Sequence, residues 1–142
     1  MSRYWLFTAD PMRYHWDTLF VKGKELWDNI RSSAAQRYLK QVRKGDHVLC
    51  YHSAPDRSVY ALAVTASDPY PEPHERGKPF LVVDLKAIER LPRSVPLKEL
   101  KLNRALRRMR FLAQPRLAVS PLSEQEYNEI LRMAGMGRGL FR

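Results

Sequence analysis

Residues 59–64 constrain the fold most, because apolar side chains occupy both alternating positions of this short segment (VYALAV). In a strand, successive side chains point to opposite faces of the sheet. A strand that is apolar on both faces must be covered on both. The segment therefore predicts a central strand with other elements packed on each side of it, as in a small barrel surrounded by helices.

Further short segments are rich in Val, Leu and aromatic residues and are bounded by turn formers, which favours strands. They are residues 4–7, 47–51, 80–88 and 116–119. The loop at 68–73 carries three prolines, whose rings restrict the backbone, and we expect it to form a stiff rim.

Apolar residues at helical spacing predict helices between these strands. One begins near Ala34 with Ser32 or Ser33 as its cap and ends at Gly45, and a short helical turn follows Pro96. A basic helix from Asn103 to Arg110 comes next. The last helix has a capping box at Ser123 and Glu126, an apolar stripe, and Gly135 at its end.

The length of 142 residues fits one domain with one core. We expect a single domain over 1–135 and a flexible tail over 136–142, in a chain that acts as a monomer. The first ten residues lack the layout of a secretion signal, which predicts a location in the cytoplasm, or in the nucleus of a eukaryote.

The net charge of +10 predicts a polyanionic partner, of which nucleic acid is the first candidate. A membrane is not expected as partner, because no stretch approaches the roughly 18–20 apolar residues of a span. A single cysteine, Cys50, excludes an intramolecular disulfide and a multi-cysteine zinc site. The four histidines show no spacing typical of a metal site, so neither a metal nor a cofactor is expected.

Several short motifs occur in an order that resembles the EVE domain family over nearly the whole chain. The segment 27–31 (WDNIR) resembles the family's Trp-Asp-Gly-Val-Arg, and residues 45–49 followed by 51–53 (YHS) resemble its Gly-Asp then Tyr-His-Ser strand. Residues 70–73 (YPEP) resemble its Tyr-Pro-Asp-Pro loop, and residues 114–122 resemble its Gln-x-Arg-Leu-Ser-Val-x-Pro-Leu pattern. Each motif is weak alone, but their joint order is specific.

The resemblance implies a PUA-like α+β fold, a small mixed β-barrel, closed or nearly closed, flanked by helices and related to YTH domains. It also implies a domain without known chemistry that binds nucleic acid and captures a flipped or unpaired modified base, such as a modified cytosine in DNA. A base pocket needs aromatic walls, small polar groups and a rim. The residues expected to form it are Trp27, Ser32, Ser33, Tyr51, Ser53, Tyr70, Pro71, Phe80 and Asp84.

Cations should hold the phosphates beside that base. The residues expected in this role are Arg31, Lys101, Arg104, Arg107, Arg108, Arg110 and Arg116. No acidic residue lies between Lys101 and Arg110, which favours phosphate contact over a merely solvated helix face.

Other interpretations remain open. Trp27 and Tyr51 could be core residues, and Asp84 could belong to a structural ion pair. Cys50 and His52 could share a strand face as a nucleophile and its base, but no third group is evident to orient the histidine, so we expect no enzyme. The alternative function is an RNA-binding PUA-like module acting on transfer or ribosomal RNA.

Overall fold

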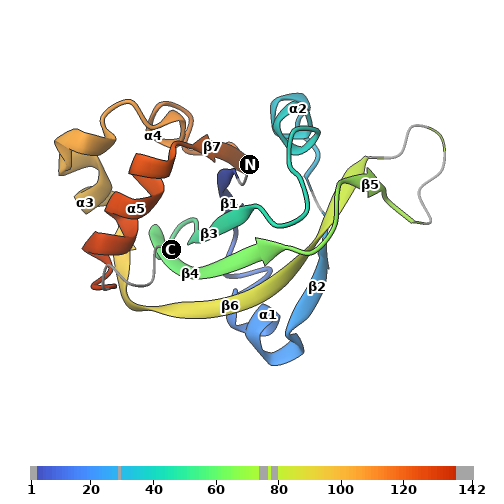
Figure 1. Cartoon of the computed structure of the whole chain (residues 1–142), viewed down its shortest axis with the longest axis horizontal. Helices are drawn as coiled ribbons and strands as arrows, with labels where there is room; N and C mark the ends of the chain where they lie inside the picture. The colour runs from blue at the N-terminus through green and yellow to red at the C-terminus, as the bar shows by residue number, and fades with distance from the viewer. Residues whose placement is uncertain (1–2, 29, 74–76, 78–79, 137–142) are drawn as a thin grey trace.

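The computed structural model describes residues 3–28, 30–73, 77 and 80–136, and its centre is one mixed seven-stranded sheet (Figure 1). Six strands follow the order β2-β6-β4-β3-β1-β7, and the short β5 pairs with β6. The pair β1 and β3 is parallel, and all other pairs are antiparallel. The strands are β1 (Tyr4–Ala9), β2 (Lys24–Trp27), β3 (His47–His52), β4 (Ser58–Thr65), β5 (Tyr70–Pro71), β6 (Leu81–Pro96) and β7 (Val119–Leu122).

The PUA-like α+β fold is confirmed, but the sheet is not closed into a barrel. The two end strands, β2 and β7, each pair with one neighbour and not with each other. The sheet instead curves, as the long strand β6 shows in Figure 1.

β6 is much longer than the strand predicted at residues 80–88. Its 16 residues pair with β5, β2 and β4 in turn, and its register with β4 shifts twice. The second half of β6 is mostly exposed, with Leu91 and Val95 as its buried residues. That half has no clear apolar alternation, so only its pairing with β4 makes it a strand.

The helices flank the sheet. In Figure 1, α3, α4 and α5 gather at the left, whereas α1 lies below the strands and α2 above them. Their bounds are α1 (Asp17–Lys22), α2 (Ser33–Leu39), α3 (Leu97–Leu102), α4 (Arg110–Ala113) and α5 (Glu124–Met133), with a 3₁₀ turn, η1 (Arg104–Leu106). Within the described part of the chain, none of them has the length and apolar character needed to cross a bilayer.

Local signals placed some elements well and others poorly. The capping box of α5 is confirmed, since Ser123 Oγ accepts from Glu126 N at 3.0 Å and Glu126 Oε1 accepts from Ser123 N at 2.9 Å. The helix predicted to reach Gly45 ends at Leu39. The prediction of one basic helix from Asn103 to Arg110 is wrong. Asn103 caps only the single turn η1, and a separate helix, α4, begins at Arg110. α1 and β2 were not predicted.

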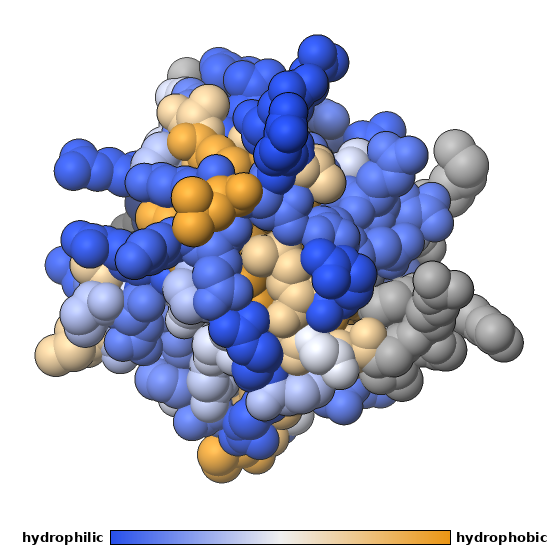
Figure 2. Space-filling view, turned by 90° about the vertical axis from the view of Figure 1, so that its left-hand side faces the viewer, coloured by the Kyte–Doolittle hydropathy of each residue, from blue (hydrophilic) through white to orange (hydrophobic). Residues whose placement is uncertain are grey.

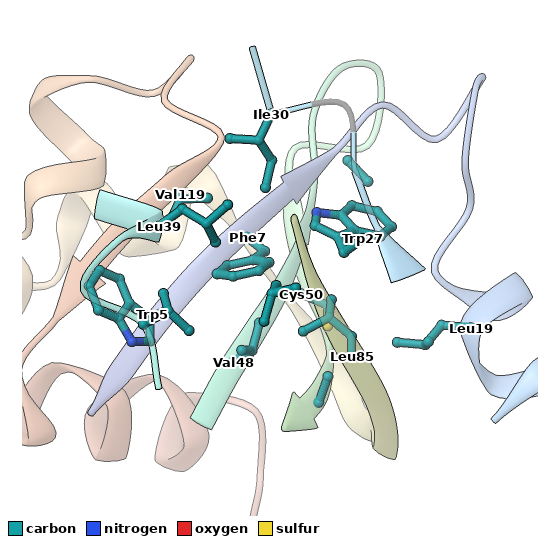
Figure 3. Packing of buried hydrophobic residues seen from close by; sticks show 14 of the residues in the cluster. Trp5, Phe7, Leu19, Trp27, Ile30, Leu39, Val48, Cys50, Leu85 and Val119 are labelled. Carbon is teal, nitrogen blue, oxygen red and sulfur yellow. The ribbon is translucent and has the colours of Figure 1, made fainter. Parts of the chain in front are cut away.

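Two cores lie on opposite faces of the sheet, which confirms that the central strand β4 is buried on both sides. On β1, Trp5 and Phe7 enter the first core, drawn in Figure 3, while Leu6 enters the second. Met136 is buried in the second core, so the predicted tail does not begin there. Residues 137–142 of that tail lie outside the described residues.

Candidate nucleic-acid interface

A hollow of about 330 Å³ opens where β1 and β2 end, and we call it the β1–β2 hollow. This is near the lower end of the ~300–1,000 Å³ typical of small-molecule pockets. Figure 3 shows Trp27 and Ile30 beside the end of β1. The hollow is lined by Thr8, Ala9, Asp10, Arg13, Tyr14, Trp27, Asp28, Ile30, Arg31 and Ala118.

Trp27 is both a core residue and a wall of this hollow. It ends β2 and is only 8% exposed. Its ring is stacked on the buried Trp16, with centroids 4.5 Å apart and 19° between planes, and meets the edge of Tyr14 at 4.9 Å. One face of the indole is therefore covered by Trp16, and a ligand can reach only the part of Trp27 that faces the hollow.

Tyr14 is held in place beside Trp27. Its hydroxyl donates to Glu25 Oε2 at 3.2 Å, and burial together with this carboxylate raises the pKa of Tyr14. The phenol thus stays protonated and keeps its bond to Glu25 at neutral pH.

Asp10 shapes the turn that carries Tyr14. Its Oδ1 accepts from Met12 N at 2.9 Å, and its carbonyl oxygen accepts from the backbone N–H of Arg13 at 2.9 Å and of Tyr14 at 2.8 Å. Such an Asx turn fixes the backbone locally. The turn places Arg13 and Tyr14 at the hollow from the β1 side.

Arg31 enters the hollow from the other side. Its guanidinium lies 4.6 Å from the centroid of Phe80, and Nη1 is 3.4 Å from Glu72 Oε1. The contact with the ring is a cation–π interaction, which limits the positions available to Arg31. Phe80 therefore contacts Arg31, which lines the hollow, but does not line the hollow itself.

None of the three predicted serines lines the hollow. Ser32 caps α2, with Oγ accepting from Ala35 N at 3.1 Å, and the exposed Ser33 opens that helix. Ser53 is half-buried, with Oγ 3.5 Å from the carbonyl oxygen of Ala9. Ser32 and Arg116 line a separate shallow depression. Residues of this depression are next in sequence to residues of the hollow, since Ser32 follows Arg31 and Leu117 precedes Ala118.

Tyr70 and Asp84 form a pair of their own. The hydroxyl of Tyr70 donates to Asp84 Oδ1 at 2.6 Å, and burial and this bond raise the pKa of Tyr70 to about 12. Asp84 therefore has a structural partner, although it is a hydroxyl and not a cation. Neither residue lines the β1–β2 hollow, and Pro71 is exposed on β5.

The expectation that Tyr51 shares a cleft with Trp27 is wrong. Tyr51 is 2% exposed and lies in the second core, with its ring 4.6 Å from that of Phe111. Side chains alternate along β3, so Tyr51 points into the second core with Leu49, whereas Cys50 points into the first core. The ring of Tyr51 therefore lies on the face away from the hollow.

The predicted phosphate-binding cations from Lys101 to Arg110 are exposed at the α3–η1–α4 end of the molecule. Figure 2 shows this end covered mainly by hydrophilic residues, with small apolar areas between them. None of Lys101, Arg104, Arg107, Arg108 and Arg110 lines the β1–β2 hollow, whose own cations are Arg13 and Arg31.

Cys50 and His52 do not form an activated pair. Burial raises the pKa of the Cys50 thiol well above its usual range, which disfavours the thiolate. His52 Nε2 accepts from Trp16 N at 2.9 Å. Because a backbone N–H can only donate, Nε2 is unprotonated and Nδ1 carries the ring proton.

The hydrogen bond from Trp16 N to His52 Nε2 also argues against a metal site. Among the described residues, one group of side chains could offer ligands to a metal. Atoms of His15, His52 and Asp56 lie within 4.8 Å of one another. The buried Nδ1 of His52 would be the ligand atom, but it bears the proton while Trp16 occupies Nε2. Burial lowers the pKa of His52 to about 4, so this imidazole is neutral at pH 7.

Of the ten residues that line the hollow, only Trp27 and Arg31 were predicted from the sequence as site residues. Thr8, Asp10, Arg13 and Tyr14 are among the eight that were missed. A signal was present, because aromatic and basic residues alternate over 13–16 (RYHW) directly after β1. Such interleaving is typical of nucleic-acid surfaces that combine stacking with phosphate contact.

Comparison with known proteins agrees with this architecture. A family model described as the EVE domain matches residues 3–133. Mouse thymocyte nuclear protein 1 is 25% identical over 167 aligned positions, covering 94% of this chain and 74% of the mouse protein. A crystal structure of an Agrobacterium tumefaciens protein superimposes with a TM-score of 0.91 at 29% identity, covering 96% of both chains. Human THYN1, solved in complex with DNA containing 5-methylcytosine, superimposes with a TM-score of 0.86 at 20% identity, covering 96% of this chain and 99% of the human one.

Proposed function

This chain belongs to the EVE domain family, and we propose that it is a nucleic-acid-binding domain that takes up one base in the β1–β2 hollow. The observation that carries the proposal is the combination in one hollow of an immobilised indole, Trp27, with two arginines, Arg13 and Arg31. The complex of human THYN1 with DNA containing 5-methylcytosine supports nucleic acid as the ligand.

The hollow offers each kind of contact that base recognition needs. A base that has left its stack requires an apolar surface and fixed polar groups at its edge. Trp27 and Ile30 supply the apolar surface, and Thr8 and Asp28 supply polar atoms. Stacking on a ring is typically worth ~1–3 kcal/mol per base.

The cations around the hollow would hold the strand that carries the base. Arg31 and Arg13 stand at the hollow, and Arg116 lies in the depression next to it, beside Ser32. The phosphates of the nucleic-acid strand would contact these three arginines where the strand passes the opening of the hollow. Phe80 contributes by bracing Arg31, and the exposed cations from Lys101 to Arg110 would add attraction that is independent of sequence.

We propose DNA with a modified cytosine as the preferred ligand, and RNA is the alternative. Equilibrium binding to matched DNA and RNA oligonucleotides, each with and without 5-methylcytosine, separates the two. The proposal expects the methylated DNA to bind most tightly. Equal affinity for both DNA forms together with tighter binding of RNA would discard the DNA reader and leave the RNA module.

The location of the site is tested by a pair of arginine variants. Arg31→Ala removes a cation of the hollow, and Arg37→Ala removes an exposed cation of α2 that does not line it. We expect Arg31→Ala to weaken binding by about 1–3 kcal/mol, as for a hydrogen bond to a charged group. Equal losses in the two variants would show that the interaction is only diffuse attraction and would remove the hollow from the proposal.

A further inference from the structure

Met12 is an apolar side chain held out into solvent. It is 81% exposed and lies in the turn between β1 and α1. Single exposed apolar residues are common on proteins and need no explanation by themselves. Met12 differs from the others because of the way its turn is built and because of what lies next to it.

The turn that carries Met12 is fixed at several atoms. Asp10 Oδ1 accepts from the backbone N–H of Met12 itself, and the carbonyl oxygen of Asp10 accepts from the next two backbone N–H groups. Pro11 restricts the backbone immediately before. The turn therefore presents Met12 at a defined place, although the thioether side chain remains adaptable.

That place adjoins the proposed base site. Asp10, Arg13 and Tyr14, which flank Met12 in sequence, line the β1–β2 hollow. Met12 itself lines a second hollow of about 440 Å³, which we call the adjoining hollow. The two hollows share Arg13, Tyr14, Trp27 and Asp28, so Met12 stands beside the wall that separates them.

We propose that Met12 enters a DNA duplex at the position vacated by the base that the β1–β2 hollow takes up, so that the domain acts on duplex DNA. This inference rests on the proposed function. Extruding a base leaves a gap in the stack and costs a few kcal/mol of lost stacking and pairing. Proteins that distort a duplex frequently insert apolar side chains, methionine among them, between base steps. A single strand has no stack to restore, so Met12 should matter for duplex and not for single strands.

Other exposed apolar residues provide a matched control. Leu102 is 74% exposed at the end of α3, and it lines neither the β1–β2 hollow nor the adjoining hollow. Leu102→Ala therefore removes a similar apolar surface away from the proposed site. Met12→Leu keeps an apolar side chain of similar size and serves as the conservative variant.

The test compares a duplex that contains one 5-methylcytosine with the same strand unpaired. In both, the base beside the 5-methylcytosine is 2-aminopurine, whose fluorescence rises when it unstacks. For Met12→Ala we expect a loss of about tenfold in duplex affinity, the scale of one lost stacking contact, with single-strand affinity unchanged. The change in fluorescence that binding causes on the duplex should also shrink. Met12→Leu and Leu102→Ala should behave as the unsubstituted protein.

Two outcomes would overturn the inference. If Met12→Ala leaves duplex affinity unchanged, or weakens duplex and single strand equally, Met12 does not replace the extruded base. The proposed function would still stand in either case, since the unsubstituted protein would bind and Arg31→Ala would weaken it. If the unsubstituted protein binds neither form, both proposals fail.

Discussion

The indole of Trp16, which is fully buried, lies against that of Trp27 with a centroid separation of 4.5 Å and an interplanar angle of 19°. The wall of the β1–β2 hollow is thus continuous with the first core. A ring held in this way cannot turn away when a ligand arrives or leaves. Its fixed position lowers the entropy cost of binding, which is the advantage of preorganisation.

Substitution of Trp27 should separate folding from binding. Trp27→Ala leaves a cavity beside Trp16 and should lower the free energy of unfolding by about 3–5 kcal/mol. Trp27→Phe keeps a ring against Trp16 and should fold, but it should lose the preference for modified DNA while retaining nonspecific binding. Denaturant unfolding and oligonucleotide titration measure the two effects. An unchanged preference in Trp27→Phe would remove Trp27 from the site.

Tyr70→Phe tests whether Asp84 is structural. The substitution removes the hydroxyl that donates to Asp84 Oδ1 and leaves the half-buried carboxylate with one donor fewer. We expect the free energy of unfolding to fall by about 1–3 kcal/mol, with DNA binding unchanged. Thermal unfolding and titration with methylated DNA check this prediction. A selective loss of binding would instead return Asp84 and Tyr70 to the base site.

His52 should make stability depend on pH in the acid range. Its pKa is about 4 in the folded protein and its ordinary value is 6.5, so between these values the unfolded state binds more protons. The contribution of His52 to the free energy of unfolding is fully present above pH 6.5 and decreases as the pH is lowered. By pH 4 the loss should reach about 3 kcal/mol.

The variant His52→Gln isolates this contribution. A glutamine oxygen can still accept from Trp16 N, but the side chain does not titrate. The free energy of unfolding, measured by denaturant at pH 7 and at pH 4.5, should change less in the variant than in the unsubstituted protein. An identical decrease in both proteins would assign the acid sensitivity to other groups.

Asp46 should be one of the most sensitive polar positions. It is buried, and its carboxylate accepts from Trp5 Nε1 at 2.9 Å and from the backbone N–H of Arg3 and Arg43. Asp46→Asn turns one acceptor into a donor and should cost about 2–4 kcal/mol of stability. Asp68→Asn is the control, because Asp68 is exposed and, among the described residues, accepts a single hydrogen bond, from Lys44 N. Similar losses in both variants would contradict the prediction.

A salt series tests the cations of the α3–η1–α4 end. If Arg107 contacts a phosphate, Arg107→Ala should weaken binding to all sequences alike and reduce the slope of log K against log salt by about 1. Arg37→Ala, on α2, should leave the slope unchanged. A slope that stays the same in Arg107→Ala would show that this arginine belongs to a solvated surface.

The sequence determined those features that depend on neighbours within a few residues. The capping box of Ser123 and Glu126 closes over three residues, and the burial of β4 on both faces follows from its own composition. The order of the short motifs identified the EVE domain family, which the family model confirms over residues 3–133. These features could be predicted because no distant part of the chain is needed to form or recognise each of them.

The tertiary structure alone decided how the site is assembled. The β1–β2 hollow joins the end of β1, the end of β2 and residues 28, 30 and 31. Its walls depend on Trp16, which lies 36 residues before its partner His52. Tyr51 shows the limit of sequence reasoning. Its position on β3 puts it in the second core, on the opposite face from Trp27, although its residue type suits a base pocket equally well. A side chain's chemistry is local, but the face it reaches is set by strand pairing over the whole sheet.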